Sequence, residues 1–366
     1  MSHPTILYIT PALSVGGAEK FLISLANSLV PDTEKQLLVS LKAVNNLQHE
    51  LAPEIDFVTL PRKYKFDLNP VLKLRRLIQS NQPAVIFCIN FYSYIIARFA
   101  MLGLNTHAKR VVSYHSTIHV TRKEHLLHKL YAALLTKKDI VITVSANQAA
   151  YTAKKYKIPL RRFTTIHNGV DTHYWHPSSG PGIRQQIRKT YGIPLDAQVI
   201  VMSAALRPEK NHLGAIKALH QLHTLYQQKA HLLLVGDGIM REAITGLCRQ
   251  LNIEHYVKFA GMQKEVRPFY WASDLFTLCS TSVETFSIAA LEAMASGLPC
   301  VLTNIGGASE MIQENLNGFV CETDENDIAG TWSKALKASF SKNSIHTYTR
   351  DNFSAEKMLK EYKKIM

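Results

Sequence analysis

The sequence predicts an α/β protein made of two doubly wound domains, and three observations support this. First, 366 residues are too many for one ordinary core. Second, short apolar segments rich in β-branched residues alternate with longer segments of helical period, which is typical of parallel sheets covered on both faces. Third, this alternation occurs twice, on either side of a segment rich in Pro, Gly and Ser at 172–182. We therefore expect domains at 1–175 and 176–345, facing each other across a cleft, and a C-terminal segment, 346–366, that packs back on the first domain.

The elements follow in order along the chain. The helix expected at 18–29 places five apolar residues on one face. The last segment, 354–366, reads as a basic amphipathic helix. The expected strands are 5–10, 36–41, 84–90, 110–115 and 139–145 in the first half and 198–206, 231–236, 256–261, 274–280 and 299–303 in the second half.

The net charge of +14 and the pI near 9.5 favour anionic partners, namely nucleic acid, phosphorylated ligands or an anionic membrane. No nucleic-acid-binding module and no interleaving of aromatic and basic residues is visible, so we expect no nucleic-acid partner. The five cysteines are scattered without metal-ligand spacing, which predicts buried free thiols in a reducing compartment. Without a signal-peptide pattern or an apolar run of about 18 residues, the expected location is the cytoplasm.

Two loops at expected strand ends suit phosphate groups. Gly16 and Gly17 follow the first strand at a helix start, where backbone N–H groups can meet an anion, although a plain tight turn is the alternative. Arg207 and Lys210 follow another strand, and a guanidinium with an ammonium three residues away suits a diphosphate, although solvated surface charge is the alternative. Neither a G-x-G-x-x-G nor a P-loop pattern is present.

The segment VETFSIAALEAMASGLPCVLTNIGGASEM, residues 283–311, carries two glutamates around an expected helix start. The free N–H groups from Phe286 through Ser287 to Ile288 would face phosphate oxygens. Glu284 precedes this helix and Glu292 lies within it among alanines, so they can accept hydrogen bonds from hydroxyls on the two sides of the phosphates. A diphosphate with hydroxyl-rich groups at both ends describes a nucleoside diphosphate sugar.

These motifs resemble those of family 4 retaining glycosyltransferases. The segment ETFSIAALEAMASGLPCVLTNIGG, preceded by LRPEKN and LLLVGDG, is similar to the donor-binding half of that family. GGAEKFLISLANSL and IHNGVD match its other landmarks, and the matches run in order over nearly the whole chain. Asn168 and Gly169, within IHNGVD, are expected to shape a hinge turn.

The resemblance implies the GT-B fold and transfer from a nucleotide-sugar with retention at the anomeric carbon. By this likeness Glu284 faces the donor sugar, Glu292 holds the ribose hydroxyls, and Arg207 and Lys210 neutralise the leaving diphosphate. His115 ends the expected strand 110–115, and by the same likeness it would lie near the reacting sugar, with a purely structural role as the alternative. The resemblance implies no cofactor, because the nucleotide-sugar is a substrate. It also implies a fold that needs no metal, because cations and a helix N-terminus can stabilise the charge that builds on the leaving phosphate.

The sequence departs from the family pattern at two positions and contains one acidic cluster. The family's arginine more often stands two positions before Arg207, where this chain has Ala205. Ser287 replaces a common glycine, and it is expected to cap the helix. The cluster DEND around Asp324 reads as a helix cap and not as a metal motif.

The expected donor is a UDP-sugar, with GDP as the other nucleotide, and the expected acceptor is a lipopolysaccharide core, a polyprenyl-linked intermediate or another glycan. Two basic segments with apolar residues at helical spacing, 61–79 and 121–138, are compatible with an anionic membrane or with ordinary solvated helices. The family likeness favours peripheral attachment to the cytoplasmic face of the inner membrane. The alternatives are a nucleotide-sugar epimerase or phosphorylase of the same architecture, and a basic nucleic-acid binder.

Overall fold

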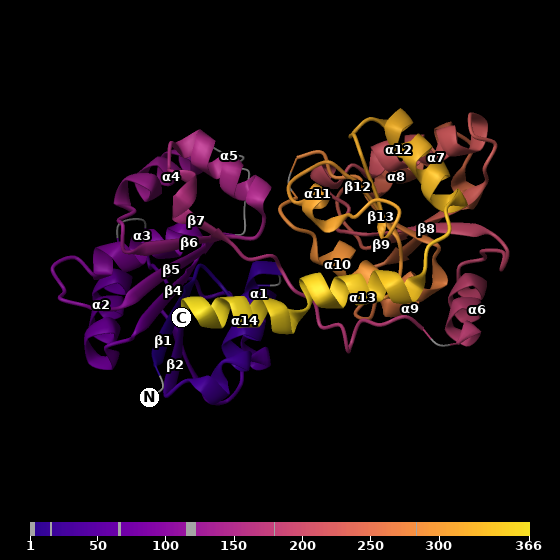
Figure 1. The fold of residues 1–366 in the computed structure, drawn as a ribbon. Coiled ribbons are helices and arrows are strands. Elements are labelled where there is room, and N and C mark those ends of the chain that lie inside the picture. The colour runs from indigo at the N-terminus through magenta and orange to yellow at the C-terminus, as the bar shows by residue number, and fades with distance from the viewer. Residues whose placement is uncertain (1–3, 15–16, 65–66, 115–121, 179, 283) are drawn as a thin grey trace. The chain divides into compact units, whose positions relative to one another are not determined.

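The computed structural model describes residues 4–14, 17–64, 67–114, 122–178, 180–282 and 284–366. The chain divides into two compact units (Figure 1). Unit 1 comprises Met1–His167 and Leu359–Met366, and unit 2 comprises Asn168–Met358.

Unit 1 contains a seven-stranded parallel sheet with the strand order β3-β2-β1-β4-β5-β6-β7. Its strands are β1 (Thr5–Thr10), β2 (Lys35–Ser40), β3 (Ile55–Thr59), β4 (Val85–Ile89), β5 (Lys109–Tyr114), β6 (Asp139–Thr143) and β7 (Phe163–Thr165). Its helices are α1 (Gly17–Ser28), α2 (Asn69–Asn81), α3 (Asn90–Ala100), α4 (Arg122–Leu134) and α5 (Ala146–Tyr156).

Unit 2 contains a six-stranded parallel sheet with the order β10-β9-β8-β11-β12-β13. Its strands are β8 (Gln198–Ser203), β9 (Ala230–Val235), β10 (Val257–Gly261), β11 (Leu275–Leu278), β12 (Cys300–Thr303) and β13 (Gly318–Cys321). Its helices are α6 (Pro181–Thr190), α7 (His212–Thr224), α8 (Arg241–Gln250), α9 (Arg267–Ala272), α10 (Ile288–Ala295), α11 (Ala308–Met311), α12 (Glu325–Lys337) and α13 (Lys342–Phe353), and α14 (Ala355–Ile365) continues into unit 1.

The central strands of both sheets are buried along nearly their whole length, as β4 and β9 illustrate. Successive side chains of a strand point to opposite faces, so continuous burial means that helices cover both faces of each sheet. This confirms the predicted doubly wound parallel sheets. All ten predicted strands are present, and the three that were not predicted, β3, β7 and β13, lie at sheet edges.

The strand order reverses between β1 and β4 in unit 1 and between β8 and β11 in unit 2. In open α/β sheets ligands bind beyond the carboxyl ends of the strands at such a switch point. In unit 2 the loops that follow β8 and β11 carry the predicted residues Lys210 and Glu284. The topology therefore brings two segments about 75 residues apart to one edge of one sheet.

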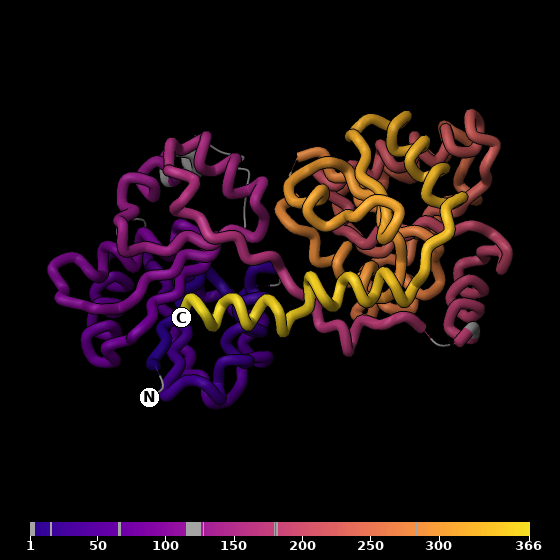
Figure 2. Tube along the Cα trace, in the orientation of Figure 1, coloured from indigo at the N-terminus to yellow at the C-terminus, as the bar shows by residue number. Residues whose placement is uncertain are grey.

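The C-terminal helix α14 is the yellow segment that ends at the label C in Figure 2. Its residues up to Met358 belong to unit 2, and those from Leu359 onward belong to unit 1. Tyr362 is its main anchor in unit 1 and is 1% exposed. Its ring lies 5.2 Å from that of Phe21 and 5.9 Å from that of Phe87, and its hydroxyl is 3.2 Å from Ser113 Oγ. The expected C-terminal helix thus exists, and its Tyr362 side chain is buried among residues of unit 1.

The five cysteines are buried and free, as predicted. Asp324 caps α12 by accepting hydrogen bonds from the N–H groups of Asn326 and Asp327, which confirms its expected role. Across the part of the chain that the structure describes, no helix combines the length and the hydropathy needed to span a bilayer.

Candidate active site

Helix α10 begins at the carboxyl edge of the unit 2 sheet, and Ser287 caps it. Ser287 Oγ accepts a hydrogen bond from the N–H of Ala290 at 3.2 Å, which confirms the predicted cap. Helix geometry leaves the N–H groups of Ile288 and Ala289 without acceptors inside the helix. This end of α10 therefore presents a partial positive charge to a ligand.

Glu284 and Lys210 form an ion pair beside this helix end. Lys210 Nζ lies 2.6 Å from Glu284 Oε2, and both side chains are about one-fifth exposed. The backbone fixes the pair, because the N–H of Thr281 donates to the carbonyl of Glu209 at 3.0 Å. Ser280 Oγ also donates to Glu284 Oε2, at 3.4 Å. A carboxylate and an ammonium are thus held together at the switch point.

Gly306 and Gly307, which follow α10 and β12 in the chain, occupy positions where the backbone packs closely. Gly306 has φ +62°, and a Cβ at this position would lie only 1.9 Å from the carbonyl oxygen of Glu284. The next residue, Gly307, donates its N–H to the carbonyl of Thr285 at 2.8 Å. Two backbone segments therefore pack together without an intervening side chain, and this contact sets the position of Glu284.

Glu292 lies within α10 and contacts Tyr270 of α9. The Tyr270 hydroxyl donates to Glu292 Oε2 at 3.4 Å, and Tyr270 is 1% exposed. Burial raises the pKa of Tyr270 well above its usual range, the charge of Glu292 raises it further, and a hydrogen bond with Ser203 acts in the opposite direction. The phenol therefore stays protonated and able to donate at all physiological pH values. Ser203 ends β8, so the three residues connect α10 to the strand end.

A pocket of about 240 Å³ lies next to Ser203 at the ends of β8, β9 and β10. The loops after β8 and β9 approach each other closely at Gly236. Gly236 has φ +138°, and a Cβ there would lie 2.1 Å from the carbonyl oxygen of Ala204. The lining residues are Ser203, Ala204, Ala205, Val235, Gly236, Asp237, Met262, Gln263 and Val266. The pocket is large enough for a planar ring.

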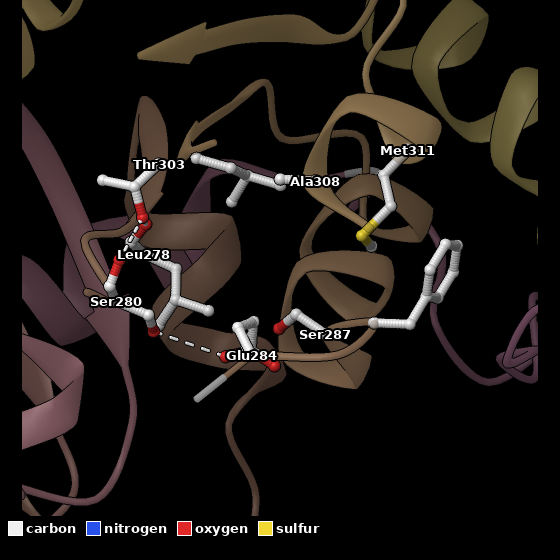
Figure 3. Close-up of a pocket in the computed structure, with 9 residues that line it drawn as sticks. Leu278, Ser280, Glu284, Ser287, Thr303, Ala308 and Met311 are labelled. Carbon is white, nitrogen blue, oxygen red and sulfur yellow. Dashed lines mark hydrogen bonds between the residues drawn. The ribbon is translucent and has the colours of Figure 1, made fainter. Parts of the chain in front are cut away.

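A much smaller cavity lies beneath the Glu284 loop (Figure 3). Its volume is about 10 Å³, which leaves room for about one water molecule at most. In Figure 3 Glu284 lies between Ser280 and Ser287, with Ala308 and Met311 of α11 closing the opposite side. This cavity is a packing space inside the loop cluster and not a ligand site.

The other predicted residues are distributed as follows. Phe286 is buried, with its ring 5.5 Å from that of Phe353, so its side chain supports the loop from inside. Ile288 is the first residue of α10. Arg207 is exposed and starts the 3₁₀ turn Pro208–Lys210 without a side-chain cap. Gly17 is the exposed first residue of α1, in unit 1.

His115 and Gly16 lie outside the described residues. The structure thus brings together Glu284, Lys210, Ser287 and Ile288, with Glu292 five residues along the same helix as Ser287. Sequence reasoning missed Tyr270 and Ser203, whose residue types and spacing carry no local signal. It also missed the pairing of Lys210 with Glu284, which depends on the strand order.

Two family models match the chain in succession. "Glycosyltransferase Family 4" matches residues 15–174, and "Glycosyl transferases group 1" matches residues 183–352. The N-acetyl-alpha-D-glucosaminyl L-malate synthase of Bacillus anthracis is 30% identical over 277 residues, which are 74% of this chain and 71% of that protein. The UDP-Gal:alpha-D-GlcNAc-diphosphoundecaprenol alpha-1,3-galactosyltransferase of Escherichia coli is 24% identical over 270 residues, 71% of this chain and 68% of that protein.

Among solved structures, Anabaena Alr3699/HepE in complex with UDP aligns with a TM-score of 0.83 and 19% identity, covering 98% of each chain. This similarity shows the fold and confirms the predicted GT-B class. Together with the family models and the Bacillus relative, it identifies the chain as a member of glycosyltransferase family 4.

Proposed function

We propose that this glycosyltransferase moves a sugar from a UDP-sugar to a glycan or lipid-linked acceptor with retention at the anomeric carbon. The observation that carries the proposal is the Lys210–Glu284 pair at the N-terminal end of α10, with Glu292 on the same helix. The bond between the anomeric carbon and the diphosphate breaks, a bond to an acceptor hydroxyl oxygen forms, and the hydroxyl proton leaves with the diphosphate or solvent.

In this proposal the diphosphate lies across the end of α10. Lys210 and the N–H groups of Ile288 and Ala289 stabilise the negative charge that builds on the leaving oxygen. The donor sugar lies beside Glu284, whose carboxylate accepts hydrogen bonds from its hydroxyls. Bound diphosphate competes with Glu284 for the ammonium of Lys210, so the ion pair loosens when the donor binds.

The nucleoside lies on the other side of the diphosphate. Glu292 accepts hydrogen bonds from ribose hydroxyls, and Tyr270 holds its carboxylate. The base enters the pocket of about 240 Å³, which Ser203 links to Tyr270. UDP is our choice of nucleotide because the similar Anabaena protein was solved with UDP and with UDP-glucose.

A thermal-shift panel tests the donor. Binding to the native state raises the melting temperature, so UDP-sugars are expected to raise it more than GDP- or ADP-sugars. A proton NMR spectrum of the glycoside product, whose anomeric configuration is fixed once the bond has formed, then reports retention. A change in sugar configuration without any acceptor would instead favour the epimerase alternative, and no shift with any nucleotide-sugar would contradict the proposal.

We also propose that transfer needs no metal ion, because Lys210 and the helix end supply the positive charge. We also propose that His115 lies near the reacting sugar and that Arg207 lies near the diphosphate. Gly17 is a further proposed contact of the donor. Activity should persist in excess EDTA. Loss of activity in EDTA with recovery on adding Mg²⁺ or Mn²⁺ would contradict this part of the proposal.

The second partner we propose is an anionic membrane surface, bound by unit 1 on the cytoplasmic face of the inner membrane. Residues 122–162 contain ten Lys and Arg against two Asp and Glu, a net charge of +8 out of +14 for the chain. Leu126 and Leu130 of α4 are 67% and 39% exposed in this basic segment, and Leu160 is 57% exposed. Exposed leucines among cations are typical of peripheral membrane contact.

Sedimentation with vesicles containing phosphatidylglycerol tests this partner. Binding is expected at low ionic strength and should fall with salt, because the attraction is screened. Leu126→Asp should weaken it, whereas Leu225→Asp, at an equally exposed leucine of unit 2, serves as the matched control. If the wild-type protein does not sediment with anionic vesicles at low ionic strength, binding to an anionic membrane is ruled out.

A further inference from the structure

Asn168 contacts the loop that carries Glu284, although the two are more than 100 residues apart. Asn168 is the first residue of unit 2 and is 8% exposed. Its Nδ2 donates a hydrogen bond to the carbonyl oxygen of Phe286 at 3.0 Å. Phe286 stands between Glu284 and the cap residue Ser287, so this bond holds the backbone at the start of α10.

The backbone next to Asn168 is itself held in place. A Cβ at Gly169 would lie 2.5 Å from the carbonyl oxygen of Ser354, so only glycine permits the observed approach of these two segments. Val170 donates its N–H to the carbonyl of Phe353 at 2.9 Å. The ring of Phe353 in turn packs on that of Phe286. Asn168 therefore projects from a segment that is fixed against the same loop by an apolar contact.

We propose that Asn168 is a positioning residue for the donor site, which it serves by fixing the Phe286 carbonyl and hence the N-terminal end of α10. The inference rests on the proposed function, because the positioned groups are those assigned to the diphosphate and the donor sugar. Asn168 itself touches neither. This positioning role differs from the hinge-turn role that the sequence predicts for Asn168, because it uses the Asn168 side chain and not only its backbone conformation.

Asn168→Asp tests the hydrogen bond with almost no change in shape. The substitution replaces the donating Nδ2 with a carboxylate oxygen that faces the Phe286 carbonyl. The dissociation constant for the donor, measured by calorimetry with UDP-glucose, is expected to rise about 10-fold at pH 8, because the Phe286 carbonyl loses the Asn168 hydrogen bond and faces a carboxylate instead. A protonated carboxyl group can donate again, so the ratio of variant to wild-type dissociation constants should fall toward one as the pH is lowered to about 5.5.

Two further variants make the outcome decisive. Asn81→Asp is the matched control, because Asn81 Nδ2 also donates to a backbone carbonyl, that of Leu77 at 2.9 Å, but within α2 of unit 1. It should leave the UDP-glucose affinity unchanged. Asn168→Ala removes the donor without adding charge, so it should weaken binding at every pH without recovery, and it replaces Asn168→Asp if that variant does not fold.

These measurements distinguish a failure of the proposed function from a failure of the positioning role of Asn168. If the wild type binds no nucleotide-sugar, the proposed function is wrong and this inference falls with it. If the wild type binds UDP-glucose and the folded Asn168 variants bind it equally well at all pH values, with only a lower melting temperature, the positioning role is wrong while the proposed function stands.

Discussion

Lys210 Nζ lies 2.6 Å from Glu284 Oε2, although 74 positions separate the two residues in the chain. One residue follows β8 and the other follows β11, and these neighbouring strands flank the switch point of the unit 2 sheet. In the proposed function, this pair supplies one charge for the diphosphate and one for the sugar. Its members should therefore have separable effects on binding and on turnover.

Lys210→Ala is expected to weaken the binding of UDP about 10- to 100-fold, because it removes a charge-assisted contact to phosphate. The affinity for uridine, which has no phosphates, should not change. Arg207→Ala should have a smaller effect, since the Arg207 side chain is exposed. Isothermal titration calorimetry of UDP and of uridine with the wild type, Lys210→Ala and Arg207→Ala measures these affinities. If Lys210→Ala weakened the binding of UDP and of uridine equally, the assignment of Lys210 to the diphosphate would be contradicted.

Glu284→Gln is expected to lower the turnover number by at least about 100-fold while changing UDP affinity less than about 3-fold. The physical reason is that an interaction realised chiefly in the transition state affects kcat more than ground-state binding. Steady-state kinetics with the donor identified by the thermal-shift panel would show the split. A large rise in KM with kcat unchanged would place Glu284 in nucleotide binding instead.

Glu292→Ala is expected to weaken UDP binding and to abolish the preference for UDP over 2′,3′-dideoxy-UDP, because the carboxylate is proposed to accept from the ribose hydroxyls. Tyr270→Phe keeps the buried ring and removes only the hydroxyl, so its effect should be the same in kind but smaller, about 2- to 10-fold. If Tyr270 acts through Glu292, the two changes combined should cost less than the sum of their separate effects.

Gly306→Ala is expected to lower activity strongly, because the new Cβ would lie 1.9 Å from the Glu284 carbonyl oxygen. Gly103→Ala is the matched control: Gly103 has a similar φ of +70°, but a Cβ there meets nothing within 4 Å. Both variants carry the backbone cost of a left-handed alanine, and only one carries the clash. Comparison of kcat at equal folded fraction, judged by circular dichroism, would expose the difference. Equal activities would mean that this packing does not set the position of Glu284.

Stability of unit 2 should fall as the pH falls from about 6.5 to 4. Burial, together with a smaller effect of nearby lysines, lowers the pKa of His212 and of His231 to about 4. In this interval the unfolded chain binds protons at both histidines and the folded chain does not, so the free energy of unfolding decreases toward acid. Each histidine contributes up to about 1.4 kcal/mol per pH unit. Urea melts at several pH values test this, and His212→Gln should flatten the dependence.

The sequence predicts the interior strands and the cap of α10 because these depend on local pattern. β4 and β9 are apolar along their length, and Ser287 stands directly before an apolar helical run. The edge strands β3, β7 and β13 escaped prediction: β7 has three residues, and β13 begins at Gly318, a weak strand former. Short edge strands draw their stability from one neighbour, so their own sequence carries little signal.

The predicted site residues were identified by chemistry and by family resemblance, whereas their mutual contacts depend on tertiary structure. The distance between Lys210 and Glu284 follows from the order of β8 and β11, which no local spacing encodes. Tyr270 reads as an ordinary core aromatic, because its hydroxyl reaches Glu292 only in the folded chain. Asn168 likewise acts on a segment more than 100 residues away.

The burial of all five thiols has a practical consequence. Burial raises the pKa of each, to about 11 for Cys248 and about 12 for Cys279, so few native thiolates are available to a maleimide at neutral pH. New cysteines at the exposed positions of Lys42 and Lys189, one on each unit, would then take fluorescent dyes selectively. Energy transfer between two such dyes would follow the units in real time as a nucleotide-sugar is mixed in.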